Sequence, residues 1–524
     1  MSRRPRWWRD AVFYQVYPRS FADSDGDGVG DLRGITDRLD HLAGAPDSLG
    51  VDAIWLSPFY RSPMADFGYD IVDHTDVDPL FGTLRDADDL IREAHARQLR
   101  VIVDLVPNHT SDRNPWFRAS RSSRSSPFRD WYVWRPGVDG RPPNNWMSEF
   151  AAVGPAWAFD DATGEWYLHS FLREQPDLNW DNPKVERAIH EVMRFWLGRG
   201  VDGFRMDAVY KIAKDPRLRD NPRPIVGPGV VPGRRFDEDW PTMRGRLTRL
   251  RTVLREFGDR MMVGEVYLLD RARLAAYINT GRRLDLAHDF TFLNNLWSAR
   301  AFRTSVMELE RLAGARGWPT WCLNNHDHPR VASRYPGEAA ARVAALMLLT
   351  LRGTPFLYQG EELGLEDGIV PPDATVDIDG RDPERCPIPW GPPSRAGPGA
   401  GFTSGAPWLP LPPDAEHRNV ETQRRSADSI LALYRRLLRL RRATPALRRG
   451  TLHIVATAAE DAFAYVRSID DRALAIVLNF GVETIRVDLP LDGRVIEATD
   501  QSLHDIRTHG GRLELPPCSG AIIG

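Results

Sequence analysis

The chain has 524 residues, of which 42% are hydrophobic and 27% are charged, and its formal net charge is −3. These values are typical of a globular protein with one large domain and one or two smaller ones, and they argue against a disordered chain. The mixed charge, without a basic stripe between aromatic residues, gives no support for nucleic acid as a partner.

Eight short apolar runs, each ending in polar residues, alternate with helical stretches along most of the chain. The runs are 11–17, 51–56, 100–106, 203–206, 261–264, 284–290, 319–323 and 354–358. This α/β alternation favours a (β/α)8 TIM barrel, although a doubly wound open sheet would alternate in the same way. Between the runs, 86–98 and 183–197 have the pattern of amphipathic helices, and Gly198 follows the second of them.

The loop 23–31, after the first run, alternates carboxylates with glycines. This spacing is like that of an EF-hand calcium loop, but the glutamate that closes an EF-hand is missing, and a plain turn is the alternative. We expect a structural Ca²⁺, for which Mg²⁺ could substitute. The candidate ligands are Asp23, Asp25, Asp27, Val29 and Asp31.

Two insertions interrupt the alternation. The segment 111–175 is rich in Trp, Pro, Ser, Asn and Arg without helical periodicity, and a loop of that length predicts a subdomain. The segment 367–420, rich in Pro and Gly, follows the eighth run. From about residue 450, short alternating strands predict a small antiparallel β domain. The predicted division is a barrel of 1–109 and 176–445, an inserted domain of 110–175 and a C-terminal domain of 446–524.

Cysteine usage and apolar runs indicate the compartment. The three cysteines are scattered, which argues against a disulfide framework and against a cysteine metal site. No apolar stretch approaches the roughly 18 residues of a membrane span, and no apolar segment of a signal peptide follows the basic N-terminus. We therefore expect a cytoplasmic protein without a membrane partner; its oligomeric state stays open.

Polar residues follow four of the runs, where the active site of a barrel forms. They are Asp104, Asn108 and His109 after the third run, Arg205 and Asp207 after the fourth, Glu265 after the fifth, and His326 and Asp327 after the seventh. A single aspartate at such a place is usually a helix cap. Several carboxylates, two histidines and an arginine on one predicted face are not explained by capping.

These residue types suit glycoside hydrolysis. A retaining mechanism needs an ionised carboxylate as nucleophile and a protonated carboxyl about 5–5.5 Å away as acid/base. Arg205 lies two positions before Asp207, on the same face of a strand, and is expected to hold that carboxylate ionised. Partial burial favours the protonated form of Glu265. His109 and His326 can donate hydrogen bonds to sugar hydroxyls.

Four ordered segments carry a family resemblance. They are Asp-Leu-Val-Pro-Asn-His at 104–109, Gly-Phe-Arg-Met-Asp at 203–207, Gly-Glu-Val at 264–266 and Asn-His-Asp at 325–327. A fifth, Gln-Pro-Asp-Leu-Asn at 175–179, ends the first insertion. The sequence resembles the α-amylase superfamily (glycoside hydrolase family 13), in its α-glucosidase and oligo-1,6-glucosidase branch, over nearly the whole chain. The resemblance implies the barrel, a B domain inserted after strand three, and a C-terminal β-sandwich.

The resemblance also implies residue roles in a double displacement through a glucosyl-enzyme intermediate. Asp207 is expected to be the nucleophile, Glu265 the acid/base, and Asp327 a fixed carboxylate that binds sugar hydroxyls. His109, Arg205 and His326 would complete the glucose site. Similar loops in this branch hold a structural Ca²⁺ near the first helix, at the place of 23–31.

Two further segments resemble the pocket that closes over a terminal glucose. In Asp-Phe-Gly-Tyr-Asp at 66–70, Asp66 would bind glucose hydroxyls and Tyr69 would stack on the ring. In 381–390, Arg385 would face Asp66 across the sugar and restrict the enzyme to exo-action. Phe150 is a candidate pocket wall, with ordinary packing of the inserted domain as the alternative.

The residue after the nucleophile bears on linkage. A small residue such as Ala208 accompanies α-1,4 bonds in this branch, so we expect maltose or short oligosaccharides as substrates, ahead of isomaltose. The difference is worth only about 1–3 kcal/mol. Some transglucosylation is expected as well.

Two alternatives remain. One is a glucosyl transferase or isomerase of the same family, similar to a trehalose synthase or sucrose isomerase, although the isomerase segment Arg-Leu-Asp-Arg-Tyr is not visible. The other, more remote, is a non-catalytic relative like the heavy chains of amino-acid transporters, which carry a transmembrane helix and lack parts of the catalytic set.

Overall fold

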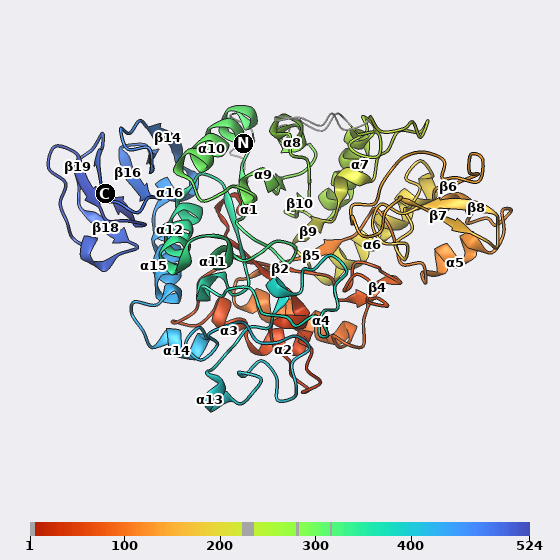
Figure 1. The fold of residues 1–524 in the computed structure, drawn as a ribbon, viewed down its shortest axis with the longest axis horizontal. Helices are drawn as coiled ribbons and strands as arrows, with labels where there is room; N and C mark the ends of the chain where they lie inside the picture. Colours follow the sequence, from red (N-terminus) through yellow and green to blue (C-terminus); the bar gives the residue numbers. More distant parts are fainter. Residues whose placement is uncertain (1–5, 223–234, 279–281, 315–316) are drawn as a thin grey trace.

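The computed structural model describes residues 6–222, 235–278, 282–314 and 317–524 (Figure 1). An eight-stranded parallel sheet has the order β11-β10-β9-β5-β2-β1-β13-β12. Its strands are β1 (Phe13–Val16), β2 (Ala53–Leu56), β5 (Arg100–Leu105), β9 (Gly203–Met206), β10 (Met261–Gly264), β11 (Leu286–Ala287), β12 (Thr320–Trp321) and β13 (Thr354–Tyr358). Consecutive strands are neighbours, and the two edge strands follow each other in the chain. The predicted (β/α)8 barrel is confirmed.

The barrel strands are short and covered on both faces. Every residue of β1, β2, β9 and β10 is buried, as expected for parallel strands packed under helices. The sixth and seventh strands, β11 and β12, have only two residues each, fewer than the apolar runs suggested. The rest of those runs passes into the loops that carry polar residues at the strand ends.

Amphipathic helices surround the barrel. They include α4 (Leu84–Ala96), α6 (Pro183–Arg199), α7 (Met243–Glu256), α10 (Ala299–Ala313), α12 (Gly337–Thr350) and α15 (Ile430–Ala443). α4 begins with a capping box between Thr83 and Asp86. α6 continues through Gly198, which we had expected to end it, and stops at Gly200, which takes the left-handed conformation at φ 109°.

The first insertion, between β5 and β9, contains α5 (Pro115–Arg121) and a small antiparallel sheet. The sheet order is β6-β8-β7, with β6 (Trp134–Arg135), β7 (Trp157–Asp160) and β8 (Glu165–Leu168). Trp146, Ala156, Trp157 and Leu168 form a separate apolar cluster in it. In Figure 1 this orange segment lies at the opposite side of the molecule from the C-terminal strands.

The C-terminal part, blue in Figure 1, is antiparallel throughout. One sheet has the order β14-β15-β16-β20-β18, with β14 (Thr451–Val455), β15 (Ala462–Ile469), β16 (Arg472–Asn479), β18 (Val495–Ala498) and β20 (Gly520–Ile523). A second pairs β17 (Ile485–Asp488) with β19 (Arg512–Leu515). Apolar side chains of both sheets share one core cluster, so the predicted antiparallel β domain is confirmed.

The second insertion is mostly irregular. It contains η5 (Pro383–Arg385) and α13 (Pro393–Ala396), followed by α14 (Val420–Arg424). Phe402 and Trp408 of this segment form backbone hydrogen bonds with Asp23 and Gly28, so the insertion packs on the acidic loop 23–31. In the described ranges, no helix is long and apolar enough to cross a membrane.

Candidate active site

The polar side chains that follow the barrel strands lie close together, as expected for the carboxyl ends of neighbouring parallel strands. Asp207 follows β9, Glu265 follows β10 and Asp327 follows β12, and all three line one pocket of about 240 Å³. Other walls of the pocket come from residues named in the sequence analysis, which are Asp66, Tyr69, His109, Phe150 and Ala208. The pocket lies at the carboxyl ends of the parallel strands, where barrel active sites form.

Arg205 connects the carboxylates at the base of this pocket. Its Nη1 donates to Asp104 at 2.6 Å and to Asp207 at 2.7 Å, and its Nη2 donates to Glu265 at 2.6 Å. The guanidinium is 1% exposed and lies over the Trp55 ring at 4.9 Å. Asp104 also accepts from the Trp55 indole at 2.8 Å.

Asp207 and Glu265 form a coupled pair of carboxyl groups. Burial and the nearby Glu265 raise the pKa of Asp207 well above its usual range, against the lowering effect of Arg205. Arg205 contacts Asp207 as expected and lowers its pKa, but this one guanidinium is divided among three carboxylates, so burial and Glu265 outweigh it. The Ala208 amide donates to Glu265 Oε2 at 3.0 Å and fixes its position.

Asp327 is the carboxylate that stays ionised. Burial would raise its pKa, but the positive charges of Arg381 and Arg385 hold it well below its usual range. Its Oδ1 accepts from Arg381 Nη1 and from Arg385 Nη2, both at 3.0 Å. Because burial keeps His326 neutral, the two arginines supply the positive charge.

His326 is fixed by a residue that the sequence analysis did not single out. Gln15, in β1, donates its amide to His326 Nδ1 at 2.8 Å, so the imidazole proton belongs on Nε2. That nitrogen faces the Tyr69 hydroxyl at 2.8 Å and Asp327 at 3.1 Å. Burial lowers the pKa of His326 well below its usual value, so the ring is a neutral hydrogen-bond donor. The Tyr69 ring stacks on it at 5.4 Å.

Asp66 pairs with a different arginine from the one we expected. Arg381 Nη2 lies 2.8 Å from Asp66 Oδ1, and Gln175 donates to the other oxygen at 2.9 Å. Arg385 is 1% exposed, donates to the His326 carbonyl at 2.8 Å and lies behind the pocket wall. Both arginines belong to the same segment, but only Arg381 reaches the pocket, because η5 turns the chain between them.

The aromatic wall comes from the first insertion. Phe150 packs edge-on against Phe171 at 5.8 Å, and Phe171 lies 5.1 Å from the His109 ring. Arg381 lies over Phe150 at 4.9 Å, so the insertion also contacts the arginine that binds Asp66. Burial lowers the pKa of His109 to about 4, which makes it neutral as well.

Several pocket residues carry no sequence signal of their own. They are Glu149, Phe171, Tyr210, Tyr267, Phe290, His328, Asp379 and Arg381. Of these, Arg381 alone could have been found, since it opens the segment 381–390 that the sequence analysis had already selected.

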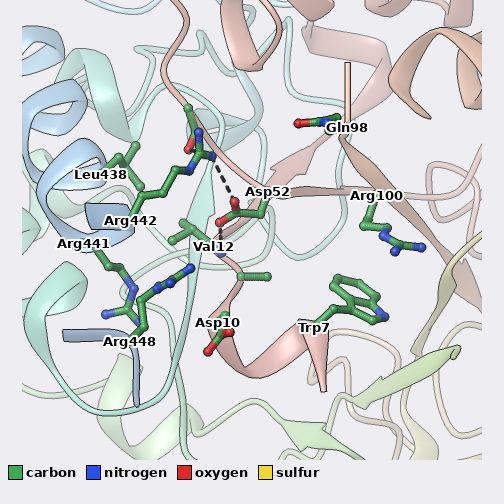
Figure 2. Close-up of a pocket in the computed structure, with 12 residues that line it drawn as sticks. Trp7, Asp10, Val12, Asp52, Gln98, Arg100, Leu438, Arg441, Arg442 and Arg448 are labelled. Atoms are coloured by element: carbon green, nitrogen blue, oxygen red, sulfur yellow. Dashed lines mark hydrogen bonds and ion pairs between the residues drawn. The ribbon is translucent and has the colours of Figure 1, made fainter. Parts of the chain in front are cut away.

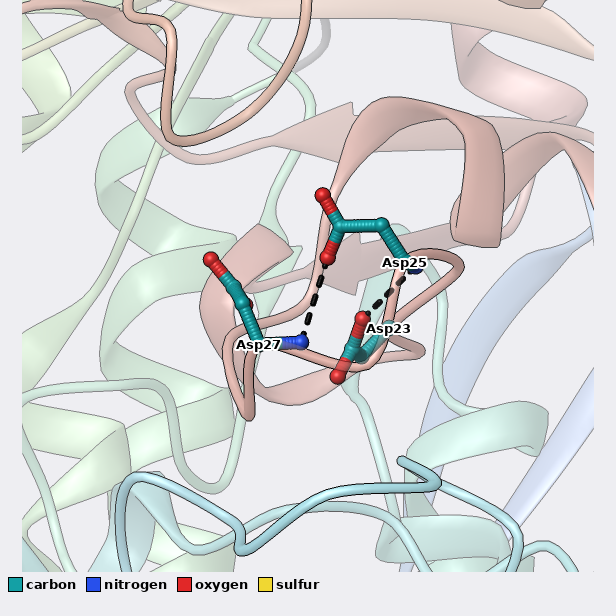
Figure 3. A group of neighbouring side chains, drawn as sticks. All are labelled: Asp23, Asp25 and Asp27. Carbon is teal, nitrogen blue, oxygen red and sulfur yellow. Dashed lines mark hydrogen bonds between the residues drawn. The ribbon is translucent and has the colours of Figure 1, made fainter.

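The acidic loop gathers three of its carboxylates (Figure 3). Oxygen atoms of Asp23, Asp25 and Asp27 lie within 4.8 Å of one another. Asp31 instead caps α2 (Leu32–Asp37), accepting from Ser24 and Gly34 at 2.7 Å each. The backbone amide of Val29 donates to Asp27 at 2.8 Å. Three clustered acidic oxygens with glycine turns between them fit the oxygen preference of a hard divalent cation.

Comparisons with known proteins agree with the matched segments. The model of the α-amylase catalytic domain matches residues 15–450. The chain is 42% identical over 515 residues to a probable alpha-glucosidase of Rhizobium meliloti (strain 1021), covering 93% of this chain and 91% of that protein.

Two solved structures superpose along the whole chain. The alpha-glucosyl transfer enzyme XgtA has 40% identity and a TM-score of 0.90, covering 99% of this chain and 100% of its own. The trehalulose synthase MutB from Pseudomonas mesoacidophila MX-45 has 34% identity and a TM-score of 0.91, covering 99% of each chain.

Proposed function

Because the chain belongs to the α-amylase family of glycoside hydrolases, in its α-glucosidase and oligo-1,6-glucosidase branch, we propose that it is a retaining, exo-acting α-glucosidase of short α-glucosides. The observation that carries the proposal is the convergence of Asp207, Glu265 and Asp327 on one small pocket. Its volume of about 240 Å³ suits a terminal sugar better than an internal segment of a polymer.

The coupled carboxyl pair supplies both catalytic groups. In the first step Glu265 gives a proton to the glycosidic oxygen while ionised Asp207 attacks the anomeric carbon. The glycosidic C–O bond breaks, the aglycone leaves as an alcohol, and Asp207 is left as a glucosyl ester. In the second step Glu265 takes a proton from water, the water oxygen replaces Asp207 at the anomeric carbon, and the initial protonation state returns. Two inversions leave the product in the α configuration.

Arg205 makes the exchange of charge between the two carboxyls possible. It contacts both of them, at 2.7 and 2.6 Å, so it can stabilise whichever one is ionised at each stage. Ionised Asp327 adds a fixed negative charge and two acceptor oxygens for sugar hydroxyls. Neutral His109 and His326 contribute hydrogen-bond donors without adding positive charge next to a developing oxocarbenium ion.

Exo-action is proposed from the Asp66–Arg381 ion pair. The pair joins the loop after β2 to the second insertion and forms part of the pocket wall. A further sugar on the non-reducing side would have to separate two buried, paired charges, which is costly. The substrate therefore enters with its terminal glucose first.

Maltose-like α-1,4 substrates are proposed ahead of α-1,6 ones. Ala208 follows the nucleophile and lines the pocket with a single methyl group. The argument is steric, and its expected size is about 1–3 kcal/mol of discrimination.

A structural Ca²⁺ is proposed for the acidic loop, with Mg²⁺ as the alternative. Asp23, Asp25 and Asp27 would hold it. Bound there, the cation would neutralise three carboxylates that pack against the second insertion through Thr403 and Asp23. No catalytic step uses this site. The three cysteines, Cys322, Cys386 and Cys518, are all unpaired, which supports a reducing, cytoplasmic location.

The second candidate function is glucosyl transfer or isomerisation. Similarity to XgtA and MutB along nearly the whole chain favours it, because the first is named for glucosyl transfer and the second for the synthesis of trehalulose. The same Asp207 and Glu265 chemistry would serve, with a sugar hydroxyl in place of water in the second step.

The experiment is a product time course with purified enzyme on maltose, isomaltose, trehalose and sucrose, each supplied alone and followed by chromatography and proton NMR. Early α-glucose from maltose, faster than from isomaltose, is the expected result. Early β-glucose would contradict the retaining mechanism, and a new disaccharide with little free glucose would select the transferase. The Asp207→Asn variant serves as the blank for contaminating activity.

A further inference from the structure

A second pocket of about 240 Å³ lies at the opposite end of the barrel from the catalytic one (Figure 2). Val12 directly precedes β1, Asp52 directly precedes β2, and Arg100 is the first residue of β5. The pocket therefore opens at the amino ends of the strands. Helices α15 and α16 (Pro445–Arg449) provide another wall, with Leu438, Arg441, Arg442 and Arg448.

The charges that line this pocket do not balance. Arg442 pairs with Asp52 at 3.0 Å, Arg100 with Asp202 at 2.6 Å, and the Asp10 carboxylate with Arg449 at 2.8 Å. Each acidic group of the pocket is thus already matched by an arginine. Arg441 and Arg448 remain, and neither has a carboxylate partner within the described ranges of the chain.

Arg441 is the buried member of this pair. It is 1% exposed, and its two terminal nitrogens donate to backbone carbonyls of Leu349 at 2.8 Å and Gly353 at 2.7 Å. Its Nε is buried without a hydrogen-bond partner. Burial lowers the pKa of Arg441 to about 10, so the group is still a cation at neutral pH. A buried cation without a counter-ion is costly unless an anion approaches it.

Arg448 is the unbonded member of the pair, because its guanidinium has no hydrogen bond or ion pair in the described part of the chain. Its Nε is also buried and without a partner. Figure 2 shows its side chain extending from α16 toward Val12, whereas Arg442 turns the other way, to Asp52. The side chains of Arg441 and Arg448 both line this pocket.

We propose that this pocket is a second binding site, for a phosphate dianion that is either inorganic phosphate or the phosphate group of a small monoester. Two uncompensated guanidinium groups match a double negative charge, and their planar donors suit the oxygen atoms of phosphate. Trp7 and Leu438 in the same lining would contact the organic part of an ester.

A neighbouring pocket extends the site. It shares Gln98, Leu438 and Arg442 with the first one and adds Arg435 and Arg439 of α15. An ester longer than inorganic phosphate would reach into this second space. Both pockets lie outside the catalytic machinery, so binding there is independent of the proposed glucosidase activity.

The test measures binding of sodium phosphate to the full chain by calorimetry and by the rise of the melting temperature, with sodium chloride at equal ionic strength as reference. Arg448→Met removes the guanidinium and keeps a long apolar stem. Arg439→Met changes an exposed arginine of α15 that lines only the neighbouring pocket, and it is the matched control. Glycerol phosphate and glucose 6-phosphate, run in parallel, distinguish an ester from the free ion.

The wild type and Arg439→Met are expected to bind phosphate saturably, and Arg448→Met to bind it roughly tenfold or more weakly, since a charge-assisted hydrogen bond is lost. Maltose hydrolysis should be the same in all three proteins. Equal phosphate affinity in Arg448→Met and wild type would overturn the proposal. So would the absence of saturable binding to the wild type, or an equal effect of chloride.

Discussion

Arg381 Nη2 lies 2.8 Å from Asp66 Oδ1, although the two residues are 315 positions apart in the chain. The same guanidinium donates to Asp327 at 3.0 Å and to Asp377 at 2.6 Å. One arginine of the second insertion thus joins the loop after β2 to the carboxylate after β12. The pocket has its shape only when the insertion is in place.

Replacing Arg381 by alanine should therefore lower kcat/KM on maltose by roughly tenfold to a hundredfold, because Asp66 and Asp327 lose a buried partner. Arg385→Lys is the comparison, since Arg385 lies behind the wall and keeps its charge in that variant. The measurement is kcat/KM on maltose for both variants and the wild type, from steady-state kinetics. Unchanged kinetics in Arg381→Ala would remove this residue from the substrate pocket.

Asp207→Asn should reduce turnover by a factor on the order of 10⁴, because the nucleophile is removed at nearly constant volume. Its melting temperature should not fall, since the change also removes repulsion from Glu265, which burial makes strong. Single-turnover kinetics and thermal melts of the purified variant measure both effects. Near-normal turnover would contradict the assignment of the nucleophile.

Ala208→Val tests the linkage argument and carries a stability cost of its own. Ala208 has φ 37° and ψ 37°, a left-handed conformation that a β-branched residue adopts with strain of about 1–3 kcal/mol. We expect a lower melting temperature together with a lower ratio of maltose to isomaltose hydrolysis. Ala208→Gly, which relieves strain and keeps the space, is the control. An unchanged substrate ratio in the valine variant would separate this residue from linkage preference.

The buried carboxyl group of Glu361 is expected to make the free energy of unfolding depend on pH. Burial raises the pKa of Glu361 to about 7, and its Oε1 accepts from the Tyr434 hydroxyl at 2.8 Å. Because the pKa is raised in the folded protein, the contribution of Glu361 to the free energy of unfolding is fully present below about pH 4.5, which is the pKa of this group in the unfolded chain. The contribution is lost as the pH rises through about 7. The loss is on the order of 3 kcal/mol.

Glu361→Gln keeps an acceptor for Tyr434 and removes the titration. The melting temperature of the variant, relative to wild type, should therefore rise between about pH 5 and pH 8. All other titrating groups are common to both proteins and cancel in the difference. Parallel melting curves across that range would show that Glu361 does not titrate there.

Chelation tests the acidic loop. EDTA should lower the melting temperature of the wild type, and added Ca²⁺ should restore it, with Mg²⁺ tested separately. Asp25→Asn should make the protein insensitive to both, at little cost by itself, because Asp25 is exposed and, among the described residues, its carboxylate accepts only from the Asp27 amide. Equal melting temperatures of the wild type with and without chelator would leave the loop as a plain turn.

The sequence determined the barrel and the strand-end residues. Parallel strands bring their carboxyl ends to one edge of the sheet, so the linear pattern of apolar runs was enough to place Asp207, Glu265 and Asp327 together. Helix boundaries were less certain, as Gly198 shows. The sequence alone does not distinguish a glycine inside a helix from a glycine that ends it. The left-handed backbone conformation of Gly200 shows that the helix ends there and not at Gly198.

The tertiary structure decided which arginine faces Asp66. Arg381 and Arg385 are four positions apart in an irregular segment, without a period that could assign them to a face, and η5 alone sets their directions. It also decided the direction in which the pKa of Asp207 is shifted. The pKa of Asp207 depends on burial and on how Arg205 is divided among Asp104, Asp207 and Glu265, and these are distances across the barrel that no local pattern contains.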